Sequence, residues 1–320
     1  MRLRNIDLLK GVLIILVIVG HILLGSTEQS LPRYIIYCFH IPVFIGLSGF
    51  LFNYTKMGQL SLKGFISKYL FRIILPWVIA VLVYKLILNF NVIVQTHDYR
   101  IFTGAFKLPY NHLWFIAAYF SWITITWLAG KLHVPLWALL VFAIGLVVTV
   151  YFIRKYPPWD AGNPSSQVYS SLIFQIYRPH LYIYFVIGLM LRNNSFSIKI
   201  WPVAIVTLSL FVVLMLSFLY RFSFVQWLLY FFNTGLLFIL VQYAKKDALP
   251  HAKWIEWIGV NSMAVYLWHM VPLIIVSQHI PASPTVLYYT VSFAAVIAFS
   301  AIIYFLTKIK PVNKYLFGMY

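Results

Sequence analysis

The sequence predicts an all-α integral membrane protein, a bundle of about ten transmembrane helices. Of its 320 residues, 62% are hydrophobic and only 9% are charged, which is more apolar than a soluble domain can cover with polar surface. Apolar runs recur along the whole chain, and a run of about 20 helical residues crosses a hydrocarbon core. Only loop-sized polar stretches separate the runs, so we expect one transmembrane domain over residues 1–320.

Hydrophobicity places the expected spans near 8–25, 34–53, 72–92, 112–129, 134–153, 172–191, 199–219, 223–243, 257–278 and 285–307. The first span is expected to stay in the mature chain, because no small-residue cleavage site follows it. The sixth contains Arg178, Pro179 and His180, which indicate either a late start or a broken helix. We find no paired interruptions of the kind that mark inverted repeats.

Basic residues predict the orientation. Most of the 24 Lys and Arg residues fall on the side that carries Arg2, Arg4 and Lys10, so both termini are expected in the cytoplasm. This bias and the attraction of anionic lipid account for the net charge of +18. The charge therefore requires no nucleic-acid partner, and membrane lipid is the expected surface partner.

The number of cysteines and the spacing of the histidines argue against a disulfide and against a metal site. Cys38 is the single cysteine, which excludes an internal disulfide. The nine histidines contain no HxxxH or HExxH pair. We therefore expect no metal site.

Ionisable groups inside a membrane are candidate functional groups, because each costs a few kcal/mol there. In the first span, Lys10 and His21 are eleven residues apart, which is three helical turns plus about 20° and a rise of about 16 Å. They therefore share one face of the helix. Asp7 precedes Lys10 by three residues and can pair with it.

Two further histidines are expected at the depth of His21. His40 lies about two turns below the outer end of the second span, and His269 lies about 18 Å beyond Trp257 if the ninth span is a straight helix. The three imidazoles would then form one layer. For each ring the alternative is a core histidine bonded to a backbone carbonyl.

The third span opens with Lys68 and Arg72, an i, i+4 pair at the level of Lys10. The alternative is that both are snorkelling anchors. Cations at the inner mouth and imidazoles farther in suit a ligand with phosphates at one end and a reactive group at the other.

Five segments carry a family resemblance: NIDLLKGVLIILVIVGHI, FHIPVFIGLSGFLF, FRIILP, NHLWFI and NSMAVYLWH. In this order they resemble the acyltransferase-3 family of bacterial membrane acyltransferases. The DxxKG and IYCFHIPVF motifs most resemble those of the fucose 4-O-acetylase-like subgroup. The resemblance implies a ten-helix enzyme of the bacterial plasma membrane. Such an enzyme moves an acyl group, often acetyl, from cytoplasmic acyl-CoA to a sugar hydroxyl of a surface or lipid-linked glycan.

The family often shows two arginines three residues apart in the third span, and here only Arg72 fits. Tyr69 occupies the other position, so we take Lys68 as the substitute.

The chemistry of acyl transfer assigns roles to these residues. The attacking hydroxyl must lose its proton, and a neutral imidazole is suited to accept it, so His21 is the expected general base. Asp7 is the second expected catalytic residue. Lys10, Lys68 and Arg72 are expected to bind the phosphates of acetyl-CoA, which is a substrate and not a bound cofactor. The oxyanion or the acceptor sugar is expected to contact His40, Asn111, His112, Trp114 and His269.

A polysaccharide or lipid-linked-sugar transporter is the alternative function. It is disfavoured because every Asp and Glu lies at a span end or in a loop, whereas proton-coupled transport usually needs an acid inside the membrane.

Overall fold

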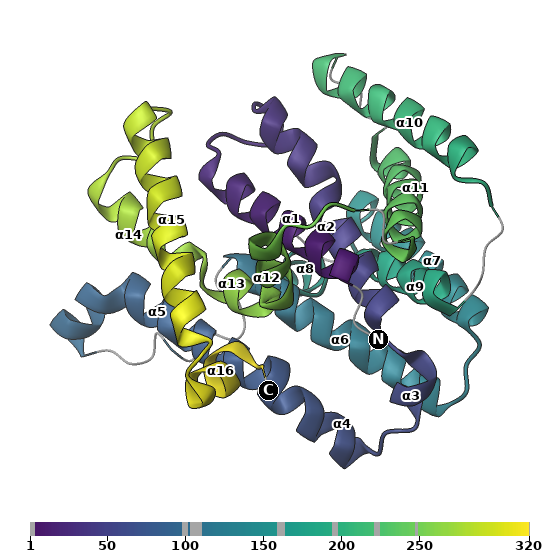
Figure 1. Cartoon of the computed structure of the whole chain (residues 1–320), viewed down its shortest axis with the longest axis horizontal. Helices are drawn as coiled ribbons and strands as arrows, with labels where there is room; N and C mark the ends of the chain where they lie inside the picture. The colour runs from purple at the N-terminus through teal and green to yellow at the C-terminus, as the bar shows by residue number, and fades with distance from the viewer. Residues whose placement is uncertain are drawn as a thin grey trace. The chain divides into compact units, whose positions relative to one another are not determined.

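The computed structural model describes residues 4–97, 102, 111–158, 164–193, 198–220, 225–246 and 249–319. Within these ranges the regular secondary structure is entirely helical (Figure 1). The chain divides into two compact units, which we describe separately. Unit 1 comprises Met1–Leu51 and Ile187–Tyr304, and unit 2 comprises Phe52–Val186 and Phe305–Tyr320.

Unit 1 is built around its first two helices. The helices assigned to it are α1 (Arg4–Ile22), α2 (Leu31–Leu51), α10 (Ile200–Tyr220), α11 (Val225–Lys245), α12 (Lys253–Val260), α13 (Ser262–Trp268), α14 (Met270–His279) and most of α15 (Val286–Leu306). α1 packs on α12 and α2, and α11 packs on α10 and α2. The core between α1, α2 and α11 is mainly aliphatic, with buried side chains that include Leu13, Val43, Leu47 and Leu237.

α1 and α12 approach each other closely because both carry glycine at the crossing. A β-carbon on Gly11 would overlap the carbonyl oxygen of Ile255, and one on Gly259 would overlap that of Asp7. The start of α1 is tied to α12 and to the segment before it, since Arg4 forms an ion pair of 3.2 Å with Glu256 of α12 and donates to the carbonyl of Leu249. These contacts fix the helix that carries His21.

Unit 2 contains α3 (Tyr54–Gly58), α4 (Leu62–Tyr69), a π-helix η1 (Leu70–Ile74), α5 (Leu75–Thr96), η3 (Asn111–Leu113), α6 (Trp114–Lys131), α7 (Leu136–Lys155), α8 (Pro164–Ser171), a π-helix η4 (Leu172–Tyr177), η5 (Pro179–Leu181) and α16 (Lys310–Phe317). α9 (Tyr182–Asn193) begins in unit 2 and continues in unit 1 from Ile187. α3 packs on α6, α6 on η4, and α7 on η5. Side-chain caps start two short helices, because Asn53 accepts from the Lys56 amide and Ser61 from the Gly64 amide.

The structure confirms the all-α membrane class. By length and composition, eight described helical segments can cross a membrane, and a ninth arises if the bent stretch from Lys253 to His279 counts as one span. The predicted span at 112–129 corresponds to α6, which is not among these eight. The number ten and the cytoplasmic termini stay predictions.

Two of the predicted spans, the sixth and the ninth, are interrupted. The sixth predicted span is broken, with η4, η5 and α9 following one another through Arg178. Pro179 explains this break, since it lacks an N–H group and disfavours helical backbone at the residue before it. The ninth bends by 75° next to Asn261, so the depth of His269 cannot be calculated from a straight helix.

The third predicted span also departs from a regular helix. Lys68 lies in the last turn of α4, whereas Arg72 lies in the π-helix η1. A π-turn bonds residue i to i+5, so the two side chains are not the i, i+4 pair of an α-helix. They remain neighbours, because Arg72 acts electrostatically on Lys68.

Candidate active site

The candidate active site of unit 1 begins with His21 in the last turn of α1. The preceding residue, Gly20, lets α2 approach, because a β-carbon there would lie 2.9 Å from the Cε2 atom of Tyr37. His21 is half-buried. α1 is helical from Arg4 to Ile22, so Lys10 and His21 share a face of it as predicted from their spacing.

His269 lies against His21. Their ring centroids are 5.3 Å apart and the ring planes are tilted by 39°. His269 is buried at the junction of α13 and α14, and its Nδ1 lies 2.8 Å from the carbonyl oxygen of Tyr266. A carbonyl oxygen only accepts, so Nδ1 carries the proton, and in the neutral ring Nε2 carries the lone pair.

His40 completes the group on α2. It is 4% exposed, its Nδ1 donates to the carbonyl of Ile36 at 2.6 Å, and its ring meets the ring of Tyr37 at 5.0 Å. His40 and His269 both lie close enough to His21 to act on its charge. Each of the two therefore makes the backbone bond expected of a core histidine and also belongs to a three-imidazole group in unit 1.

Arg33 also lies near His21, and the sequence analysis did not identify it. It acts electrostatically on His21, donates to the carbonyl of Leu23 at 3.0 Å and lies over the Tyr37 ring at 5.3 Å. Arg33, Tyr37 and His40 are spaced i, i+4 and i+7, which places them on one face of α2. That spacing was the signal that could have identified Arg33.

Asp7 and Lys10 lie at the other end of α1, near the crossing with α12. Fourteen residues separate Asp7 from His21, which on a regular helix is a rise of about 21 Å. Asp7 therefore cannot orient the His21 imidazole by direct contact.

Comparison with protein-family models matches residues 3–305 to an acyltransferase domain, that of the acyltransferase-3 family. The chain belongs to the acyltransferase-3 family. It is accordingly a multi-pass membrane acyltransferase. Comparison with curated proteins and with solved structures gives no match.

In unit 2 of this acyltransferase, Lys68 and Arg72 belong to a basic group with Lys56. Both Arg72 and Lys56 act electrostatically on Lys68. The Nζ atom of Lys68 lies 3.1 Å from the sulfur of Met57, which attaches the group to α3. Arg72 is fixed from the other side, since Gly318 packs on its carbonyl oxygen and adopts a left-handed φ of 67° that suits glycine.

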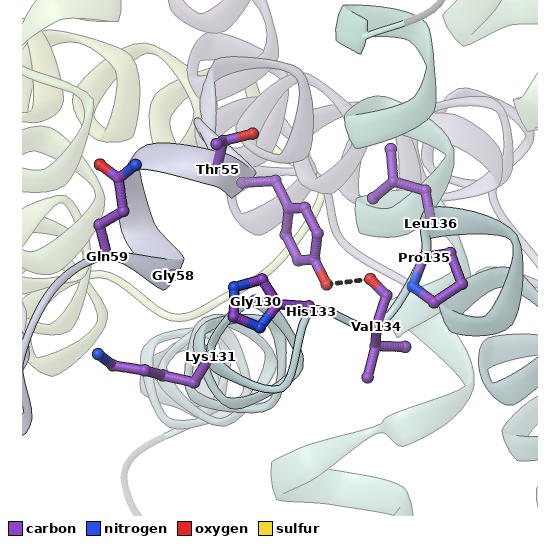
Figure 2. Close-up of a pocket in the computed structure, with 10 residues that line it drawn as sticks. Thr55, Gly58, Gln59, Gly130, Lys131, His133, Val134, Pro135 and Leu136 are labelled. Atoms are coloured by element: carbon purple, nitrogen blue, oxygen red, sulfur yellow. Dashed lines mark hydrogen bonds between the residues drawn. The ribbon is translucent and has the colours of Figure 1, made fainter.

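α3 also lines a pocket of about 580 Å³ with the end of α6 and the start of α7 (Figure 2). Gly58 and Gly130 lie backbone to backbone there, and the hydroxyl of Tyr54 donates to the carbonyl of Val134 at 2.5 Å. The pocket is lined by Tyr54, Thr55, Gly58, Gln59, Gly130, Lys131, His133, Val134, Pro135 and Leu136. Residues more than seventy positions apart in the chain form it, so the sequence analysis did not detect it.

The remaining predicted site residues also lie in unit 2. His112 is 3% exposed and its ring meets the Tyr84 ring at 5.2 Å. Trp114 opens α6, and the guanidinium of Arg178 lies 3.8 Å from its ring centroid. Asn111 opens η3, but its side chain lies outside the described residues. The three-imidazole group of unit 1 therefore takes His21, His40 and His269 from the predicted residues and leaves His112 in the other unit.

Proposed function

We propose that the protein transfers an acyl group, most simply acetyl, from cytoplasmic acyl-CoA to a sugar hydroxyl of a surface or lipid-linked glycan, with His21 as general base. The observation that carries this proposal is the packing of the His21 ring against His269, within electrostatic range of His40, in a chain of the acyltransferase-3 family. A bacterial plasma membrane is the proposed location.

The proposed reaction needs one proton acceptor. The sugar oxygen attacks the thioester carbonyl, its proton moves to neutral His21, the C–S bond breaks, and the proton then passes to the leaving thiolate of CoA. Neutral His269 donates through Nδ1 to Tyr266 and therefore is not a donor to the oxyanion. Its Nε2 lone pair instead suits it to accept from His21 and so to orient the base.

The proposed donor site uses Lys10, Lys68 and Arg72. Support comes from the basic group of unit 2, where Lys56, Lys68 and Arg72 interact electrostatically. Met57 of α3 contacts Lys68, and other residues of α3 line the pocket with Lys131, which offers space for part of a nucleotide.

Changes in donor affinity test this site. Lys68→Gln or Arg72→Gln should raise the KM for acetyl-CoA by about tenfold and make CoA binding less sensitive to salt. Lys63→Gln is the matched control, because this exposed lysine of α4 is not part of the basic group. Equal KM values for all three variants would exclude the assignment.

Transport of a polysaccharide or lipid-linked sugar is the second candidate function, because interrupted spans also occur in transporters. The composition of the surface glycan decides between the two. Deleting the protein should remove an acyl group from an otherwise unchanged glycan, as read by mass spectrometry. Loss of the whole glycan from the surface, with acylation intact, would instead favour transport.

A further inference from the structure

The pocket of unit 2 is lined by two side chains that can bind an anion, Lys131 at the end of α6 and His133 just after it. We infer that this pocket holds the adenosine 3′-phosphate end of the acyl-CoA donor, with Lys131 and His133 at the 3′-phosphate. The inference rests on the proposed function, because it assumes an acyl-CoA donor. It goes beyond that function by giving the 3′-phosphate a binding place separate from Lys68 and Arg72.

The size and lining of the pocket suit a nucleoside. Its volume of about 580 Å³ lies within the range of roughly 300–1,000 Å³ that small-molecule sites occupy. Thr55 and Gln59 line it with groups that can bond a base or a ribose, and Tyr54 lines it with an aromatic ring. An aromatic ring is a surface on which a nucleic-acid base can stack.

The walls of the pocket are held together by direct contacts between its elements. A β-carbon on Gly58 would lie 2.7 Å from the carbonyl oxygen of Gly130, so α3 and α6 meet backbone to backbone. The hydroxyl of Tyr54 donates to the carbonyl of Val134 at 2.5 Å, which fixes the tyrosine ring. A site that is formed before the ligand arrives loses less free energy to ordering on binding.

His133 has an uncommon backbone conformation at the edge of the pocket. Its φ of 54° is left-handed, which is costly for a residue with a β-carbon. The turn is held because the His133 amide donates to the Gly130 carbonyl at 3.3 Å and the Val134 amide to that of Ala129 at 2.9 Å. Strain of this kind often occurs at ligand sites. An imidazole carries an N–H donor in either protonation state, so His133 can donate to a phosphate oxygen.

Lys131 supplies the fixed positive charge of the pocket. It is exposed, and Figure 2 shows its side chain and that of Gln59 extending from the ends of α6 and α3 toward the same side of the view. An ammonium group forms charge-assisted hydrogen bonds with phosphate oxygens.

The length of α3 brings the pocket near the proposed donor cations. α3 has five residues, a rise of about 7.5 Å. Met57 within it contacts the Nζ atom of Lys68 at 3.1 Å, and three other residues of α3 line the pocket. In CoA a single ribose separates the 3′-phosphate from the 5′-pyrophosphate. The pyrophosphate can therefore lie at Lys68 and Arg72 while the 3′-phosphate lies in the pocket.

The test is calorimetric titration of the full-length purified protein in neutral detergent with CoA and with 3′-dephospho-CoA. Neither ligand has an acyl group to transfer, so binding alone is measured. Wild type should bind CoA about tenfold more tightly than 3′-dephospho-CoA, the factor expected for charge-assisted hydrogen bonds to one phosphate. This preference should shrink at higher salt.

Lys131→Gln is the decisive variant, because an exposed lysine at the end of α6 can be replaced without disturbing the core. It should bind 3′-dephospho-CoA like wild type and lose most of the preference for CoA. His133→Gly accepts the left-handed backbone and removes the ring, so it should also reduce the preference. Lys155→Gln is the matched control, since this exposed lysine ends α7 and does not line the pocket. It should keep the full preference.

Lys68→Gln separates the two phosphate sites. It should weaken CoA and 3′-dephospho-CoA by the same factor, because both ligands carry the pyrophosphate, and it should keep the preference for CoA.

Equal affinity of wild type for the two ligands, or an unchanged preference in Lys131→Gln, would overturn the inference and leave the proposed donor in place. Loss of the preference in Lys68→Gln and not in Lys131→Gln would place the 3′-phosphate at the basic group, which would also overturn it. If neither ligand binds, the proposed acyl-CoA donor fails and the inference fails with it.

Discussion

At the scale of single residues, the three imidazoles of unit 1 differ in their surroundings. His40 and His269 each give Nδ1–H to a carbonyl of their own helical segment, whereas His21 packs against His269 and is half-buried. His21→Ala should therefore lower kcat by about 10² to 10⁴-fold while acetyl-CoA binding stays near wild type, because the loss is confined to the transition state.

Purified His21→Ala protein with unchanged thermal stability is the material for this assay. Near-normal acylation by that folded variant would exclude His21 as the base. Activity of wild type should also fall at acid pH, since a protonated imidazole cannot accept the hydroxyl proton.

The proposed orienting role of His269 predicts a different result. His269→Asn retains an amide able to donate to the Tyr266 carbonyl but lacks the Nε2 lone pair that would face His21. It should lower kcat by about tenfold with little change in KM or stability, the size expected for one hydrogen bond lost in the transition state. Unchanged kcat in a stopped-flow assay would show that His269 is structural.

At the scale of elements, the crossing of α1 and α12 determines where α1 lies in unit 1. Gly11→Ala would push a methyl group into the Ile255 carbonyl, and overpacking of this kind costs about 1–3 kcal/mol. Thermal melting in detergent should show the loss. Gly145→Ala is the control, because nothing lies within 4 Å of a β-carbon at that position of α7. A Gly11→Ala protein as stable as the control would contradict the close crossing.

Element boundaries were largely predictable, because long runs of hydrophobic residues identify membrane spans. The expected span 199–219 is α10, Ile200–Tyr220, and the expected 223–243 is α11, Val225–Lys245. The π-turn at Arg72 and the bend next to Asn261 were not predictable, since apolar residues fit α and π geometry equally well.

The candidate site was only partly accessible to sequence for a related reason. Depth along a span grouped His21, His40 and His269, but spacing within one span gives no information on which helices are neighbours. Arg33 and the pocket at Lys131 both depend on contacts between segments, so neither was found.

At the scale of the whole molecule, the predicted orientation decides whether the donor comes from the cytoplasm. Single cysteines at Gln29 and Pro281 should react with an impermeant maleimide in intact cells, and those at Gln59 and Lys246 should react only after lysis. Gln59 and Lys246 lie on the predicted cytoplasmic side, and Gln29 and Pro281 lie on the predicted outer side. Native Cys38 is buried, so background labelling from it should be low. Reaction of Gln59Cys but not Gln29Cys in intact cells would reverse the orientation.

The π-helix at Leu70–Ile74 has a consequence for insertions and deletions in this chain. Its hydrogen bonds span one residue more than those of an α-helix, so it accommodates one extra residue before the chain returns to α5. Lys68 and Arg72 are four residues apart, one more than the arginine pair expected from the family resemblance. The wider π-turn therefore offsets the extra residue between Lys68 and Arg72, so that their angle around the helix axis is close to that of residues three apart on an α-helix. Removing Leu70 or Phe71 would restore both an ordinary α-turn and a three-residue spacing between Lys68 and Arg72, whereas a one-residue deletion within α5 would rotate the helix beyond it by about 100°.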